Sequence, residues 1–205
     1  SNNLINYICT SKFKKMINIT LPDGSRKKIE NGSTPMDIAK SISEGLARNV
    51  LCASVNGEIW DSNRPINFDA KIILHTWKDK EGKMVFWHST SHIMAEALEE
   101  LYPGIKFGIG PAIENGFYYD IDFGEHTIST EDLTEIEKKM KEIASKKVTF
   151  ERINITKKDA ISFFKRKKDE YKLELIEELE DGEITFYRQN KFTDLCKGPH
   201  ITSTR

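Results

Sequence analysis

Apolar and polar residues alternate with a period of two over residues 16–21, and a returning strand is predicted over 26–30. This period is typical of β-strands that bury one face. The intervening Pro22-Asp23-Gly24-Ser25 supplies turn-forming residues, so the pattern predicts a β-hairpin. Further short strands are predicted over residues 51–55, 58–60 and 71–76, with an Asn56-Gly57 turn joining the first two.

A helical spacing of apolar residues lies between the hairpin and the later strands. Thr34 is the candidate N-cap and Pro35 occupies the first helical position. The apolar stripe consists of Met36, Ile38, Ala39 and Ile42. One helix among several short strands predicts a small α+β module with the helix lying across a sheet. His75 falls within a strand pattern and is predicted to be structural.

The second half of the chain is also predicted to be α+β. A helix beginning near His88 carries an apolar stripe and is stopped by Pro103-Gly104. That stripe consists of Met94, Ala97, Leu98 and Leu101. Two further helices are predicted, over residues 130–147 and after the candidate cap Thr156. The predicted strands cover residues 107–111, 116–122, 173–176 and 184–189.

These patterns divide the chain into two predicted domains with a charged linker between them. We expect a polar tail over residues 1–13, a small domain over 14–77, a linker over 78–83 and a larger domain over 84–205. The opening Ser1-Asn2-Asn3 is interpreted as a remnant of an expression vector. The abrupt end at Thr204-Arg205 suggests a piece of a longer protein.

Composition narrows the possible function classes. The formal net charge is −1, which excludes a globally basic nucleic-acid binder but not a local basic patch. Three scattered cysteines do not indicate a disulfide framework, and no long apolar run or signal peptide is evident. We therefore expect a cytoplasmic protein with reduced thiols and without membrane insertion.

Two pairs of metal-ligating or proton-transferring residues stand about a hundred residues apart. His88 and His92 are spaced i, i+4, as are Cys196 and His200. In a helix this spacing puts two side chains on one face. His88 and His92 lie away from the predicted apolar stripe, so they are not expected in its packing face. Their predicted place near a helix N-terminus favours neutral imidazoles. The alternative is that both are ordinary residues of a helix.

The first domain resembles a known module. The stretches Ile19–Ser25, Thr34–Ala39 and Val55–Glu58 resemble the TGS domain, a β-grasp module of threonyl-tRNA synthetases, some GTPases and (p)ppGpp synthetases. The resemblance by itself identifies only a module.

The second domain resembles the editing domain of threonyl-tRNA synthetases. The motifs that carry the resemblance are His88–His92, Gly108–Pro111, Asn115–Asp120, Tyr171-Lys172 and Asp194–His200. The alanyl-tRNA synthetase editing domain shares both His/Cys pairs. It lacks the TGS module, however, and typically has Gly-Gly-Thr where Lys197-Gly198-Pro199 stands here. A smaller departure is Thr90-Ser91, where the threonyl family usually has Cys-Ala.

The resemblance implies hydrolysis of the ester that joins serine to threonine tRNA. His88 and Lys172 would activate the water or the departing ribose oxygen, while His92 and His200 would shape the pocket. Asp194 would hold the substrate amine or orient a base. Cys196 is expected to be a polar or steric wall, with a nucleophilic role as the alternative. The remaining implied substrate-binding residues are Gly110, Pro111, and Tyr118 or Tyr119, which would stack on adenine.

The resemblance also implies partners and cofactors. We expect tRNA as the partner, no membrane, and homodimerisation of the parent enzyme through domains beyond this region. No cofactor is expected here, because ATP and zinc belong to the family's aminoacylation domain. Two alternatives stay open: a zinc-dependent deacylase of the alanyl type, since the four His and Cys residues are donors that zinc accepts, and a TGS-led module that binds or regulates without catalysis.

Overall fold

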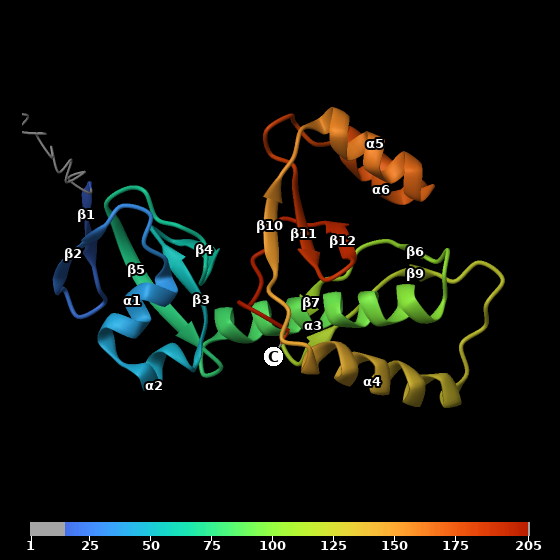
Figure 1. The fold of residues 1–205 in the computed structure, drawn as a ribbon, viewed down its shortest axis with the longest axis horizontal. Helices are drawn as coiled ribbons and strands as arrows, with labels where there is room; N and C mark the ends of the chain where they lie inside the picture. Colours follow the sequence, from blue (N-terminus) through green and yellow to red (C-terminus); the bar gives the residue numbers. More distant parts are fainter. Residues whose placement is uncertain (1–14, 205) are drawn as a thin grey trace, which may run out of the picture.

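The computed structural model describes residues 15–204, so the predicted tail over 1–13 lies outside the described residues. Figure 1 shows two parts connected by one long helix, α3 (Lys80–Leu101). The first part lies on one side of the N-terminal end of α3. The second part is assembled around the rest of that helix. The protein is therefore α+β in both parts, as predicted.

The first part is a five-stranded mixed sheet with two short helices. Its strand order is β2-β1-β5-β3-β4, in which β1 pairs with β5 in parallel and the other neighbours are antiparallel. The elements are β1 (Met16–Thr20), β2 (Arg26–Glu30), α1 (Pro35–Ile42), α2 (Glu44–Ala47), β3 (Val50–Val55), β4 (Glu58–Asp61) and β5 (Ala70–Thr76). The predicted alternation is seen directly in β1, where Ile17 and Ile19 are buried in the core.

Local sequence signals in this part act as predicted. Thr34 caps α1, and its hydroxyl and backbone exchange hydrogen bonds with Asp37 in a capping box. Asn56 and Gly57 have φ values of 52° and 92°, the left-handed conformation that a two-residue hairpin turn requires. His75 is buried in β5, and its Nε2 lies 2.6 Å from the Ser54 hydroxyl, which fits the predicted structural role.

The predicted linker over residues 78–83 is largely helical, because α3 begins at Lys80. Gly82 is buried against the end of β5, where a Cβ atom would overlap the Thr76 carbonyl. The two parts therefore pack directly, and one apolar cluster contains Cys52 from β3 together with Val85, Tyr187 and Ile201. Lys80, Glu81 and Lys83 lie in the first turn of this helix, and the composition alone does not distinguish such a turn from a linker.

The second part contains a three-stranded antiparallel sheet with helices on both faces. Side chains of α5, α6 and one face of the sheet form one apolar cluster, including Phe164, Ile176 and Phe186. Tyr187, the next residue of the central strand, points to the opposite face and packs in the cluster of α3. The elements are α4 (Thr130–Ser145), β10 (Glu151–Asn154), α5 (Lys157–Lys167), α6 (Glu170–Glu177), β11 (Thr185–Gln189) and β12 (Phe192–Leu195).

The predicted hairpin over residues 107–122 forms as two short antiparallel pairs. They are β6 (Lys106–Phe107) with β9 (Ile121–Asp122), and β7 (Ala112–Ile113) with β8 (Gly116–Phe117). Thr156 caps α5 as predicted.

The strand predicted over residues 173–176 is wrong, because these residues lie in α6. The Asp169 side chain accepts a hydrogen bond from the Lys172 amide and caps that helix. Leu173 and Ile176, spaced i, i+3, pack on one side of it. A short apolar run is compatible with either element, and the tertiary packing selects the helix. Among residues 15–204, no helix is both long enough and apolar enough to span a membrane.

Replacing Gly82 by Ala is expected to lower the free energy of unfolding by about 1–3 kcal/mol, because the added methyl overlaps the Thr76 carbonyl. Gly45 provides a matched control in α2, since a Cβ there meets its nearest neighbour, the Ser43 hydroxyl, at 3.9 Å. Gly45→Ala should leave stability unchanged or raise it by up to about 1 kcal/mol. Urea unfolding of both variants measures the difference, and equal effects would contradict close packing at Gly82.

Candidate functional site

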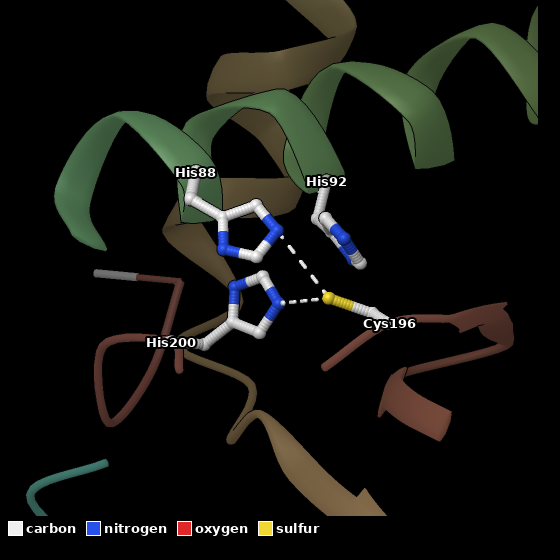
Figure 2. Close-up of side chains that lie close together, drawn as sticks. All are labelled: His88, His92, Cys196 and His200. Carbon is white, nitrogen blue, oxygen red and sulfur yellow. Dashed lines mark hydrogen bonds between the residues drawn. The ribbon is translucent and has the colours of Figure 1, made fainter. Parts of the chain in front are cut away.

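Four side chains from two distant segments converge on one point. His88 and His92 come from α3, and Cys196 and His200 come from the loop after β12 (Figure 2). We call these four residues the His/Cys cluster. Their ligand atoms lie within 4.8 Å of one another. The Cys196 sulfur lies 3.3 Å from His88 Nε2 and 3.4 Å from His200 Nε2.

The periodicities of the helix and the strand bring these side chains together. On α3, the i, i+4 spacing puts His88 and His92 one above the other, with ring centroids 5.2 Å apart. In β12 the period of two directs alternate side chains toward α3, beginning with the buried Phe192 and continuing with Asp194. Cys196 follows at the same interval. The fold therefore brings the i, i+4 pair of α3 and the alternate side chains that continue from β12 together in one site.

Hydrogen bonds at the Nδ1 atoms of His88 and His200 set the tautomers of these two histidines. His88 Nδ1 lies 3.2 Å from the Pro199 carbonyl, which can only accept, so Nδ1 carries the proton. The Ser89 hydroxyl donates to the Val85 carbonyl and accepts from the Ile201 amide, which leaves it one lone pair for His200 Nδ1–H at 3.1 Å. Both histidines therefore direct an unprotonated Nε2 toward the same sulfur.

A buried ion pair lies beside the His/Cys cluster. Lys172 in the first turn of α6 and Asp194 in β12 are 3% and 4% exposed, and Lys172 Nζ lies 3.0 Å from Asp194 Oδ2. Lys172 also donates to the Gly108 carbonyl at 3.0 Å, and the Tyr119 hydroxyl donates to Asp194 at 3.3 Å. Within residues 15–204, these bonds use two of the three ammonium protons, so one is available to a ligand.

The ion pair and three members of the His/Cys cluster, namely His88, His92 and Cys196, border one cavity of about 590 Å³, a volume suited to a small organic ligand. Most of the residues singled out from the sequence line it: His88, His92, Gly110, Pro111, Tyr119, Lys172, Asp194 and Cys196. His200 is fully buried behind Cys196 and is not among the lining residues. Tyr118 is 67% exposed and likewise does not border the cavity.

Tyr119 is held in a way that leaves its ring little freedom to stack on a ligand. A Cβ atom on Gly110 would come within 2.7 Å of the Tyr119 ring, so a glycine is needed there for close approach. The phenol is engaged with Asp194, and burial raises its pKa well above the ordinary range. Tyr119 is thus a wall of the cavity.

Burial makes the imidazoles of this site neutral. It lowers the pKa of His88, and it lowers the pKa values of His92 and His200 well below the ordinary value. The predicted proximity of these histidines to a helix N-terminus is wrong as the reason for their neutral imidazoles. Because α3 begins at Lys80, His88 lies beyond the first turn, where the helix dipole acts.

Burial also raises the pKa of the Cys196 thiol to about 12, although the Gly198 amide donates to its sulfur at 3.2 Å. The thiol is therefore protonated at neutral pH. Since the thiolate is the nucleophilic form, Cys196 is a poor nucleophile in this environment.

The His/Cys cluster fits a zinc ion in donor type, because three imidazoles and one thiol form a common tetrahedral set. His92 Nδ1 is buried without a hydrogen-bond partner among the described residues, which leaves it free to bind a ligand. An ion held by all four would have a closed shell with no position for a reacting water. The Lys172 ammonium, near enough to lower the pKa of His92, would oppose a dication.

Several residues that support the site carry no pattern in the sequence. Ser89 lies one position from His88, and only the fold shows that it holds His200. Ile59, from β4 of the first part, borders the cavity. Asp61 and Tyr187 bond to each other and contact the loop that contains His200. The bonds of Ser89 to His200, of Tyr187 to Asp61 and of His200 to Asp61 each join residues more than a hundred positions apart.

Both parts of the chain are similar to regions of known proteins. Residues 17–76 match the family model of the TGS domain, which confirms the resemblance of the first part. The chain is 61% identical to the threonine–tRNA ligase of Cytophaga hutchinsonii and 60% identical to that of Parabacteroides distasonis. It is 56% identical to the threonine–tRNA ligase of Bacteroides fragilis. Each match covers 92% of this chain.

The same matches cover only 29% of the length of each of these relatives. The identity extends over 189 residues in each case, well beyond the TGS match, and therefore includes the second part. Over the region that it spans, which includes the TGS domain, the chain is similar to these threonine–tRNA ligases.

Proposed function

We propose that the chain hydrolyses the ester between serine and a threonine tRNA, removing a wrongly attached amino acid. The observation that carries this proposal is a single cavity bordered by a neutral imidazole, His88, and by the Lys172–Asp194 ion pair. A base, an ammonium and a carboxylate around one opening suit water attack on an aminoacyl ester. Similarity to threonine–tRNA ligases supports the choice of substrate.

The reaction requires one water and two proton movements. The water oxygen forms a bond to the serine carbonyl carbon, and the bond from that carbon to the ribose oxygen breaks. One water proton passes to His88 Nε2, and the departing ribose oxygen receives a proton from an acid such as the Lys172 ammonium. The products are free serine and tRNA, with no change of oxidation state.

The other residues bind and confine the substrate in this proposal. Asp194 accepts the protonated amine of serine, and His92 Nδ1 supplies an unused polar atom for its hydroxyl. Cys196 forms the wall, in agreement with its protonated thiol. His200 acts from behind that wall, and stacking on adenine is not assigned to Tyr118 or Tyr119.

Selection between amino acids explains why such a site is useful. Serine lacks one methyl group of threonine, and a binding pocket rejects the smaller side chain by only about 1–3 kcal/mol. A hydrolytic site works in the opposite sense, because it sterically excludes the larger amino acid. We propose tRNA as the partner and the cytoplasm as the location. Ligation with ATP and zinc, and homodimerisation, would belong to other regions of the relatives.

A zinc-dependent deacylase is the second candidate. It is favoured by the two Nε2 lone pairs directed at one sulfur, which has a single proton to share. We place it second because the closed shell and the Lys172 ammonium both oppose a catalytic ion at this position.

We expect the purified chain to release serine from seryl-tRNA and to leave threonyl-tRNA intact. In the proposal, the Cys196 wall excludes the extra methyl group of threonine sterically. The measurement is release of labelled amino acid from tRNA charged separately with each, over a range of chain concentrations. Equal rates for the two esters would contradict a discriminating pocket.

Replacing His88 by Ala should reduce the deacylation rate roughly tenfold to a hundredfold, because a positioned base is lost. The matched control is Thr90→Ala on the same helix. Within the described part of the chain, the Thr90 hydroxyl bonds only the Phe86 carbonyl, and Thr90 is not among the residues that border the cavity. That control should retain the wild-type rate, and a His88→Ala protein with full activity would remove His88 from the mechanism.

The pH dependence identifies the base independently. His88 acts when neutral, and burial sets its pKa below the ordinary value of about 6.5. The wild-type rate should therefore be level above that pH and fall only as the pH drops through the lowered pKa. The residual activity of His88→Ala should lack this fall.

We expect the chain to purify without stoichiometric zinc and to keep its deacylase activity after EDTA treatment. The measurements are elemental analysis and rates before and after chelation. About one zinc per chain, with activity lost to EDTA and restored by zinc, would instead establish the second candidate. Replacing Cys196 by Ser would then also release the metal.

A further inference from the structure

A carboxylate from the TGS domain reaches the loop that carries the His/Cys cluster. Asp61, the last residue of β4, is only 4% exposed. Its Oδ1 accepts the His200 backbone N–H at 2.8 Å. The Tyr187 hydroxyl lies 2.9 Å and 2.8 Å from the two carboxylate oxygens and donates to this group. Asp61 forms no ion pair among residues 15–204, so these donors stabilise its charge.

The two donors shape the backbone between Cys196 and His200. Gly198 has a φ of 73°, and a Cβ atom there would overlap the Tyr187 hydroxyl. The Tyr187 ring also lies edge-on to His200, with centroids 4.5 Å apart. On another side, Phe150 stacks on His200 at 4.9 Å. Asp61 therefore fixes both the backbone amide of His200 and the Tyr187 ring, against which the loop packs.

We propose that Asp61 is a positioning residue of the hydrolytic site and that the TGS domain is thereby a working part of the deacylase. The inference rests on the proposed function. Asp61 acts through His200, whose Nε2 contacts the Cys196 sulfur that borders the cavity. Loss of this anchor would let the loop shift, and a shift of about 1 Å at a reacting centre can cost roughly a hundredfold in rate.

The neighbouring residue provides a matched control. Ser62 is fully buried, and its hydroxyl lies 2.7 Å from that of Thr202 across the same interface. Ser62→Ala thus weakens the contact between the parts without touching the His200 amide. Asp61→Asn is the conservative variant, because its amide oxygen still accepts that N–H. Asp61→Ala removes the acceptor.

The test measures kcat and KM for seryl-tRNA with the full chain and these three variants. We expect Asp61→Ala to lower kcat roughly tenfold or more with little change in KM, and Asp61→Asn to restore most of it. Ser62→Ala should keep kcat near wild type even if its melting temperature falls. Full kcat in Asp61→Ala, or equal losses in Asp61→Ala and Ser62→Ala, would overturn the proposal.

A second readout separates this inference from the proposed function. The NMR signals of the His200 ring and amide should shift in Asp61→Ala and stay in place in Ser62→Ala. If the wild-type chain releases no serine, the proposed function fails. The NMR signals would still show whether Asp61 positions the loop that carries His200. A shift confined to Asp61→Ala would support Asp61 as the anchor of the loop, and unchanged signals would overturn it.

Discussion

A buried ion pair between Lys172 and Asp194 joins α6 to β12 and borders the cavity. Two charges taken out of water are stable only when each is paired and hydrogen-bonded, and removal of one partner from such a pair typically costs about 3–5 kcal/mol. Here the Gly108 carbonyl and the Tyr119 hydroxyl supply the further bonds. The pair therefore ties three segments together, and the shape of the cavity depends on it.

Burial imposes a desolvation penalty on the Lys172–Asp194 pair, and it also sets the protonation states of the neighbouring side chains. Desolvation keeps the three imidazoles of the His/Cys cluster neutral and the thiol protonated. A neutral imidazole can accept a proton, whereas a protonated thiol is a poor nucleophile and contributes only its surface to the cavity. The buried charges beside this cluster are those of Lys172 and Asp194. The site thus contains a neutral base, His88, beside a buried charged pair, Lys172 and Asp194.

The arrangement of the two parts bears on the role of the TGS domain. Its β4 contributes Ile59 to the cavity and Asp61 to the His200 loop, while Gly82 allows α3 to begin directly at the end of β5. A flexible linker would let the parts move independently. Here α3 packs against the end of β5 and one apolar cluster includes residues of both parts, which fits the supporting role proposed for the TGS domain.

The sequence by itself determined the local features. The alternation in β1, the Thr34 cap, the Asn56-Gly57 turn and the paired spacing of the His/Cys cluster all follow from neighbours along the chain. Tertiary structure decided whether residues 173–176 form a strand or a helix, and it placed Tyr118 outside the cavity and His200 behind it. It alone brought Asp61 to His200, 139 positions away. Caps, turns and periodicity arise from contacts within a few residues, whereas burial and partners depend on segments that meet only after folding.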